Sequence, residues 1–265
     1  MGQSPDFVVK DLDELGVAIT GGSSGIGLAA AERLATAGVP RILLIGRNPG
    51  RGAAAVARVK AREPSVAIEF LSADCNDPDT AAEAIEHAEE VLQGVDLLIN
   101  ATAATFVPDL IYDISPSDIP LILAEQALAP LLTTRLVLPH MRARRGGAII
   151  NIASDAAKVP TPGESMIGAA MAAIVTFSRT IAMEAKRDGI RVNILTPSLV
   201  TGTATAERIF QEGFSQKLFQ KAGSQAHLGI SVPEDQAELI LYLASPQAAR
   251  LTGQAISLNG GISAA

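Results

Sequence analysis

Short apolar runs alternate with longer alanine-rich stretches along almost the whole chain, and this alternation limits the fold more than any other feature. The runs that we predict to be strands are Gly16–Thr20, Arg41–Gly46, Val66–Leu71, Val95–Asn100, Ala148–Ala153, Arg191–Thr196 and Ala255–Leu258. The amphipathic stretches that we predict to be helices are Gly27–Ala37, Ala53–Arg62, Thr80–Leu92, Leu121–Arg144, Ser165–Arg187 and Glu234–Leu243. This pattern predicts a doubly wound α/β fold, in which helices cover both faces of one seven-stranded parallel sheet. The runs are apolar throughout, as expected for strands buried on both faces.

No linker, repeat or low-complexity stretch divides the sequence, so we predict one domain over residues 1–265. The least regular segment, residues 201–231, follows the sixth predicted strand. Ligands bind at the carboxyl ends of the strands in such sheets, so we expect this segment to cover a substrate site. Its larger apolar side chains, at spacings compatible with one helical face, are Phe210, Phe214, Leu218 and Phe219. They would either line an apolar substrate pocket or pack the cover onto the core.

Composition excludes several classes of protein. With 48% hydrophobic residues among 265, the chain is long enough to bury a large core. A net charge of −7 argues against nucleic acid as a partner, and the basic cluster of residues 142–145 is better explained as the basic end of a helix. Cys75 is the only cysteine, so neither an intrachain disulfide nor a cysteine zinc site is expected, and we predict no metal.

Two stretches bear on location. Residues 1–10 lack the charge, apolar core and small-residue cleavage site of a signal peptide. The most apolar later stretch, residues 166–177, is shorter than the roughly 20 residues that a membrane span requires. We therefore expect a soluble cytoplasmic protein without a membrane partner.

A glycine-rich turn, Thr20-Gly21-Gly22-Ser23-Ser24-Gly25-Ile26-Gly27, follows the first predicted strand and opens a helix. Glycines allow a tight bend and a close approach of the backbone, and a helix N-terminus offers unpaired N–H groups to a pyrophosphate. The position of this turn predicts a Rossmann-type dinucleotide site.

The same turn also satisfies G-x-S-x-G, the nucleophile elbow of hydrolases, with Ser23 as the nucleophile. That elbow normally follows a later strand, whereas this one follows the first. The only histidines are His87, His140 and His227, and the first two fall inside predicted helices. We therefore prefer the dinucleotide interpretation.

The spacing G-x-x-x-G-x-G resembles the turn of the short-chain dehydrogenase/reductase family. The resemblance continues in order along nearly the whole chain. It is carried by Asp74, the 96–100 run Asp-Leu-Leu-Ile-Asn, the 138–141 run Leu-Pro-His-Met, the 150–154 run Ile-Asn-Ile-Ala-Ser, the 189–193 run Gly-Ile-Arg-Val-Asn, and the 252–254 and 259–261 runs Thr-Gly-Gln and Asn-Gly-Gly. It implies a Rossmann-type sheet of order 3-2-1-4-5-6-7 and a dinucleotide-dependent oxidoreductase that acts on a small molecule.

The cofactor preference depends on the end of the second strand, where an acid would bind a ribose 2′-hydroxyl and an arginine a 2′-phosphate. Arg47 stands there and no acid does, which favours NADP(H) over NAD(H), although Arg47 could also be a solvated residue at the strand end. The resemblance implies further cofactor-binding residues in four groups: the turn residues Gly21, Ser23, Ser24, Gly25, Ile26 and Gly27; Asp74 and Cys75 near the adenine; Asn100 and Ala101 near the ribose; and Pro197, Val200 and Thr201 near the nicotinamide carboxamide.

The family delivers a proton from a tyrosine whose pKa is lowered by a lysine four residues later, aided by a serine. Ser154 matches that serine and is the predicted catalytic residue. Counting from both sides without a gap, the tyrosine and lysine positions are occupied by Ile167 and Met171. The family's usual proton transfer is therefore absent. Losing a general acid lowers the rate roughly 10²–10⁴-fold.

Other departures also lie near the nicotinamide. The resemblance implies an asparagine where Gln126 stands, and the family sequences expected at residues 100–103 and 197–198 are also altered. Only two tyrosines exist: Tyr242 is expected to pack in the last helix, and Tyr112 has no lysine placed to lower its pKa.

Three functions remain open. The first is an NADP(H) oxidoreductase with an atypical site, acting on a small apolar carbonyl or activated alkene, with the proton coming from water, Ser154, Asp155, Lys158 or Glu164. We expect those last three to be solvated loop charges. The second is a catalytically inactive NADP(H)-binding sensor or structural subunit. The third is a non-redox catalyst such as a dehydratase, against which the intact glycine turn argues.

The two long apolar stretches of residues 121–141 and 165–185 predict self-association, since relatives pack these helices against a neighbouring subunit. We expect a homodimer or homotetramer, or a hetero-oligomer with an active relative.

Overall fold

The computed structural model describes residues 7, 9–211 and 213–265. Residues 1–6 and 8, where we expected no signal peptide, and Glu212 of the predicted cover lie outside the described residues.

Seven parallel strands form one sheet, as the alternating sequence predicted, and its order β3-β2-β1-β4-β5-β6-β7 is the one that the family resemblance implied. The strands are β1 (Gly16–Thr20), β2 (Arg41–Gly46), β3 (Ala67–Ser72), β4 (Leu97–Asn100), β5 (Gly147–Ile152), β6 (Ile190–Leu195) and β7 (Ala255–Ile256). β1, β4 and β6 are buried along their whole length, which explains why their sequences are apolar runs without alternation.

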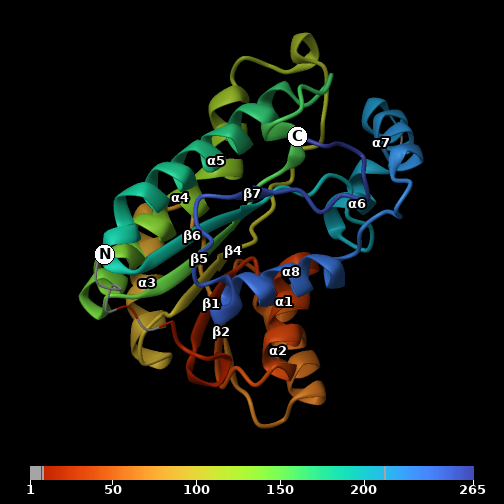
Figure 1. Ribbon diagram of the computed structural model, residues 1–265. Coiled ribbons are helices and arrows are strands. Elements are labelled where there is room, and N and C mark those ends of the chain that lie inside the picture. The colour runs from red at the N-terminus through yellow and green to blue at the C-terminus, as the bar shows by residue number, and fades with distance from the viewer. Residues whose placement is uncertain (1–6, 8, 212) are drawn as a thin grey trace.

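Helices cover both faces of the sheet (Figure 1). The helices are α1 (Gly25–Thr36), α2 (Pro49–Arg62), α3 (Pro78–Val91), α4 (Ile119–Arg144), α5 (Ser165–Ala185), α6 (Ala204–Ile209), α7 (Phe214–Gln225) and α8 (Pro233–Ala244). Helices α1, α2 and α8 pack on one face, and α3, α4 and α5 pack on the other. Short 3₁₀ turns lie at Leu12–Glu14, Ile111–Asp113, Asp155–Ala157, Lys186–Asp188 and Pro246–Ala248.

Alternate residues of the strands pack into two hydrophobic cores, one on each face of the sheet. Val17 and Ile19 of β1 pack with Leu34 of α1, whereas Ala18 between them packs with Ile85 of α3 on the other face. All five are completely or almost completely buried. The sheet therefore holds the loops at its carboxyl edge between two packed layers.

The segment of residues 201–231 is more regular than we expected. It contains α6 and α7, which project beyond the sheet edge at the right of Figure 1. The expectation that Phe210, Phe214, Leu218 and Phe219 share one helix is wrong, because Phe210 ends α6 and the other three belong to α7. Gly213, with φ of +128°, lies immediately before α7 and helps to separate the two helices.

Among the described residues, two helical segments, Ile119–Arg144 and Ser165–Asp188, are long and apolar enough to pass a test for membrane spans. Both pack against the sheet through Ala129, Val137 and Ile181, so their length and composition are those of helices that border a protein core. The basic cluster of residues 142–145 lies at the C-terminal end of α4, as predicted.

Candidate functional site

A cavity of about 680 Å³ lies at the carboxyl edge of the sheet, a size typical of small-molecule sites. Its walls come from the turn after β1, the ends of β2 and β3, the loops after β4, β5 and β6, and helices α4 to α7. The topology explains this gathering, since all seven parallel strands deliver their carboxyl ends to one edge.

The glycine turn between β1 and α1 borders the cavity. Gly21 has φ of +68°, and a Cβ on it would lie 2.4 Å from the Ala101 carbonyl oxygen. A Cβ on Gly27 would lie 2.6 Å from the Gly21 carbonyl oxygen. Only glycine permits this close backbone packing. The packing brings the first N–H groups of α1 to the cavity, and these groups have no hydrogen-bond partner within the helix. The turn therefore fits a pyrophosphate by its geometry as well as by its sequence.

Arginines border the adenosine end. The Nη1 atom of Arg47 lies 3.9 Å from Oδ2 of Asp74, and both side chains are about half exposed. Arg51, which the sequence reasoning missed, lines the same part of the cavity. It lies in the first turn of α2, and its place close after the end of β2 is the signal that would have revealed it. Two guanidinium groups at this end favour a ligand with an additional phosphate.

Cys75 also lines the cavity and is buried. Burial, helped by the Asp74 charge, raises the pKa of its thiol to about 12. The thiol is therefore protonated at neutral pH and acts as a small apolar contact.

A buried hydrogen-bond network lies beneath the floor of the site. Asn100 accepts from the Thr20 and Thr133 hydroxyls at 2.9 and 2.8 Å and donates to Asn151 Oδ1 at 2.8 Å. Asn151 in turn donates to the Ser178 hydroxyl at 2.8 Å. The network joins β1, β4 and β5 to α4 and α5, and so fixes the two helices that border the reacting end relative to the sheet.

The reacting end contains the four positions singled out from the family resemblance. Gln126 of α4, Ser154 after β5, and Ile167 and Met171 of α5 all line the cavity. The Ser154 Oγ atom accepts a hydrogen bond from the Ala156 N–H at 3.2 Å, which restricts its rotamer. Gly168 lets α5 approach this loop closely, since a Cβ there would lie 2.9 Å from the Ala156 carbonyl oxygen.

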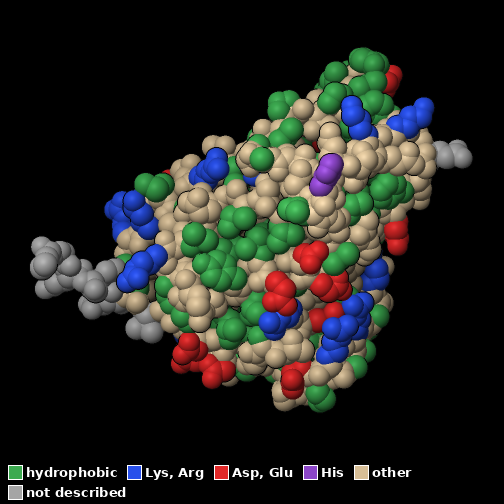
Figure 2. Space-filling view, turned by 45° about the vertical axis from the view of Figure 1, so that its right-hand side comes forward, with side chains coloured by type: hydrophobic (Ala, Val, Ile, Leu, Met, Phe, Trp, Pro, Cys, Tyr) green, Lys and Arg blue, Asp and Glu red, His purple; other side chains and the backbone are tan. Residues whose placement is uncertain are grey.

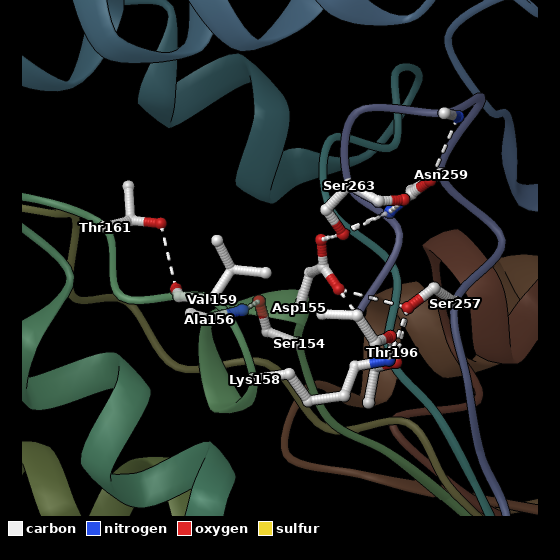
Figure 3. Close-up of polar contacts among 12 residues, drawn as sticks. Ser154, Asp155, Ala156, Lys158, Val159, Thr161, Thr196, Ser257, Asn259 and Ser263 are labelled. Atoms are coloured by element: carbon white, nitrogen blue, oxygen red, sulfur yellow. Dashed lines mark hydrogen bonds and ion pairs between the residues drawn. The ribbon is translucent and has the colours of Figure 1, made fainter.

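Asp155 and Lys158 are not the solvated loop charges that we expected. Asp155 is 5% exposed and accepts hydrogen bonds from Ser257 (3.1 Å), Asn259 (3.1 Å) and Ser263. Lys158 Nζ lies 3.9 Å from the Asp155 carboxylate and donates to Ser257 at 2.5 Å, and burial lowers the pKa of Lys158. Figure 3 shows these groups converging from the loop after β5 and from the C-terminal segment. The expectation failed because the C-terminal segment folds back over this loop.

Glu164 also departs from that expectation. It is partly buried, precedes the first residue of α5 and lines the cavity. Burial raises the pKa of Glu164 to about 7. A hydrogen bond from Thr161 lowers this pKa, and the nearby charge of Asp155 adds to the increase, but burial has the largest effect. Its carboxyl group can therefore gain or lose a proton near neutral pH.

Helices α6 and α7 close the cavity from above. Arg208 of α6 donates to the Ala104 carbonyl at 2.9 Å, which ties the cover to the loop after β4. The Phe214 ring of α7 packs on Gly163, where a Cβ would overlap it at 2.2 Å. Leu218 and Phe219 line the cavity while also packing in a small core within the cover, so these two side chains meet both of our expectations.

Most of the predicted cofactor residues border the cavity, but some do not. Those that line it are Gly21, Ser23, Ser24, Gly25, Ile26, Arg47, Asp74, Cys75, Ala101, Pro197 and Val200. Gly27, Asn100 and Thr201 are not among the lining residues: Gly27 packs within the turn, Asn100 belongs to the network below, and the Thr201 amide bonds to Ser231.

The remaining histidines and tyrosines lie elsewhere. No histidine lines the cavity among the described residues, so the histidine that a hydrolase elbow at Ser23 would need is missing from its lining. Tyr112 is 78% exposed and outside the lining, and Tyr242, which we expected to be packed, is 47% exposed because it lies on the outer side of α8.

Comparisons with known proteins agree with this architecture. A family model described as short chain dehydrogenase matches residues 16–213. The 2-(S)-hydroxypropyl-CoM dehydrogenase 3 of Xanthobacter autotrophicus is 31% identical over 250 residues, which cover 94% of this chain and 96% of that protein. The L-sorbose reductase of Gluconobacter frateurii, solved with NADPH and L-sorbose, has a TM-score of 0.83 and 31% identity over 94% of this chain and 96% of that one.

A second solved structure is similar over almost its full length. It is an NADPH-bound short chain oxidoreductase from Pseudomonas aeruginosa PAO1, described as containing an atypical catalytic center, with a TM-score of 0.86 and 29% identity over 96% of this chain and 99% of that one. The sheet order, the glycine turn and these matches lead to one assignment. The chain belongs to the short-chain dehydrogenase/reductase family of oxidoreductases.

Proposed function

We propose that this protein is an NADP(H)-dependent oxidoreductase with an atypical catalytic site, acting on a small apolar carbonyl or activated alkene. The observation that carries the cofactor preference is the pair Arg47 and Arg51 at the adenosine end of the cavity, where no acid ends β2. Two of the similar solved structures contain NADPH, which supports the same choice.

The residues present fit a dinucleotide along the whole cavity. The N-terminus of α1 would hold the pyrophosphate, Arg47 and Arg51 the 2′-phosphate, and Pro197 and Val200 the nicotinamide side. When bound, the cofactor supplies or accepts a hydride. Ser154 would donate a hydrogen bond to the substrate oxygen, and the apolar Ile167 and Met171 would exclude water.

The cofactor preference is tested by fluorescence titration with NADPH and NADH. We expect NADPH to bind about 10–100-fold more tightly, because hydrogen bonds to a charged group contribute about 1.5–3 kcal/mol. Arg47→Ala should remove most of this difference. Arg33→Ala on α1, where the side chain pairs with Glu238 away from the cavity, is the matched control. Equal affinities for the two cofactors in the wild type would contradict the proposed preference.

A second function is favoured by Ile167 and Met171, which give α5 no ionisable group at the positions of the family's catalytic pair. In that case the protein would bind NADP(H) without turnover, as a sensor or as a structural subunit. NADPH oxidation with a panel of small ketones and enones separates the two, since tight binding without any turnover supports the inactive protein.

We further propose a cytoplasmic homodimer or homotetramer, assembled through α4 and α5, with no nucleic-acid or membrane partner and no metal. The net charge of −7 argues against a nucleic-acid partner. The exposed apolar residues Leu121, Leu128 and Met183 on these helices support the assembly. A hetero-oligomer with an active relative would use the same surface.

A further inference from the structure

Glu164, the N-cap residue of α5, lines the same cavity as the face of that helix that carries Ile167 and Met171. It precedes Ile167 by three residues and Met171 by seven, a spacing that places all three on one side of a helix. All three line the cavity together with Ser154. One ionisable group, at the N-cap, therefore lies about one turn before the helix positions at which the family carries a phenol and an ammonium.

The other ionisable groups after β5 are already committed to structural contacts. The Asp155 carboxylate accepts from three donors, and Lys158 donates to Ser257 and to the Ala265 carbonyl oxygen at 2.5 and 2.6 Å. These bonds hold the loop to the C-terminal segment (Figure 3). Glu164 forms no ion pair with any cation among the described residues, so its proton is not fixed by a charged partner.

We propose that Glu164 is the proton donor of carbonyl reduction in this protein, and the proton acceptor of the reverse oxidation, in place of the family's tyrosine. This inference rests on the proposed oxidoreductase function. It assigns Ser154 the complementary role of holding the substrate oxygen by a hydrogen bond.

The proton and electron balance is complete with a reduced nicotinamide dinucleotide as the reductant. The substrate carbon gains a hydride, the electron pair of the C=O π bond moves to oxygen, and the Glu164 O–H bond breaks as the new O–H bond of the alcohol forms. The resulting carboxylate then takes a proton from solvent. One hydride and one proton are consumed for each alcohol produced.

The surroundings of Glu164 determine how this group titrates. The charge of Asp155 acts on it from the loop after β5, Glu125 lines the cavity from α4, and Arg208 and Lys221 line it from the cover. Burial has the largest effect and favours the protonated form, as a proton donor near neutral pH requires. Reduction should therefore slow as the pH rises above about 7, and oxidation should slow below it.

The test compares Glu164→Gln, Glu164→Asp and the wild type at saturating NADPH with the best substrate of the carbonyl panel. Glu164→Gln should lower the rate of reduction about 10²–10⁴-fold while leaving the NADPH affinity within about twofold. Glu164→Asp, which keeps an acid, should restore part of the rate with a displaced pH profile. Glu184→Gln, an exposed substitution near the other end of α5, is the matched control and should change neither quantity.

A second readout does not depend on turnover. The difference in unfolding temperature between wild type and Glu164→Gln should change between pH 5 and pH 8.5, whereas Glu184→Gln should show no such change. Glu164→Gln with the wild-type rate and pH profile would overturn the proposal, as would a wild type that binds NADPH but never turns over. A wild type that fails to bind NADPH would instead refute the proposed function itself.

Discussion

At the scale of single residues, burial gives the two carboxyl groups after β5 different properties. Asp155 is enclosed by donors from the C-terminal segment, while Glu164 faces the cavity and has a pKa raised to about 7 by burial. Such perturbed groups in a cleft are typical of functional sites. The first carboxyl stabilises the loop, and the second is available for chemistry.

The raised pKa of Glu164 predicts how stability depends on pH. The folded state binds this proton more tightly than the unfolded state, so stability should fall as the pH rises from about 4.5 to about 7. Because the side chain keeps some contact with solvent, we expect a loss of about 1–3 kcal/mol in the free energy of unfolding. Glu164→Gln should therefore be more stable than wild type at pH 8.5 and show no such advantage at pH 5.

The two substituted positions on α5 can be tested directly. Restoring the family pair with Ile167→Tyr and Met171→Lys together should create or raise carbonyl reduction, since both positions line the cavity beside Ser154. Either change alone should do less, because the ammonium lowers the pKa of the phenol. NADPH oxidation by the double variant, compared with each single variant, is the measurement. No gain would mean that the nicotinamide pocket is remodelled more widely.

At the scale of elements, the site depends on how closely the turn after β1 packs against the loop after β4. Gly21 lies under the Ala101 carbonyl with a positive φ, and Asn100 beside it bonds to β1, α4 and β5. The glycine turn and the buried network therefore both join β1 to β4. A change at either place should affect cofactor affinity and stability together.

Gly21→Ala should cost about 2–5 kcal/mol of stability, from roughly 1–2 kcal/mol of left-handed strain and 1–3 kcal/mol of overlap with Ala101. It should also abolish NADPH binding. Gly38→Ala is the matched control, since its φ is +98° but nothing lies within 4 Å of the added Cβ. That variant should lose only the strain of about 1–2 kcal/mol and bind NADPH normally. Chemical denaturation and fluorescence titration measure both effects.

At the scale of the whole molecule, apolar side chains remain on the surface of the helices and of one projecting segment. Leu121, Leu128 and Met183 on α4 and α5 are 63%, 37% and 61% exposed. The segment between β4 and α4, at the top of Figures 1 and 2, carries the exposed Ile111 and Tyr112 among other hydrophobic groups. Surfaces of this kind are typical of proteins that associate, as short-chain dehydrogenases commonly do.

Sedimentation velocity at micromolar concentration should therefore show a dimer or tetramer. Leu128→Arg places a charge on α4 and should shift the protein toward monomer, because a stable interface of about 1,200–2,000 Å² tolerates few unpaired buried charges. Ala54→Arg, an exposed change on α2 over the opposite face of the sheet, is the control and should leave the assembly intact. A monomeric wild type would contradict the predicted association.

The sequence by itself determined the sheet, its strand order and the glycine turn. Apolar runs and Ala-rich helices are local patterns, and parallel strands joined by helices have few allowed arrangements, so these features follow from residues near one another in the chain. The ends of the strands shifted by only one or two residues. The three positions Ser154, Ile167 and Met171, which line one cavity, were singled out by the family resemblance.

Only the tertiary structure decided what surrounds the charges after β5. The groups that enclose Asp155 come from Ser257, Asn259 and Ser263, more than 100 residues away, and no local pattern reveals such a contact. The burial of Glu164 likewise depends on the loop, the helix and the cover meeting at one edge. Desolvation is a property of the packed molecule, so the sequence gives the position of a carboxyl group and the fold sets its pKa.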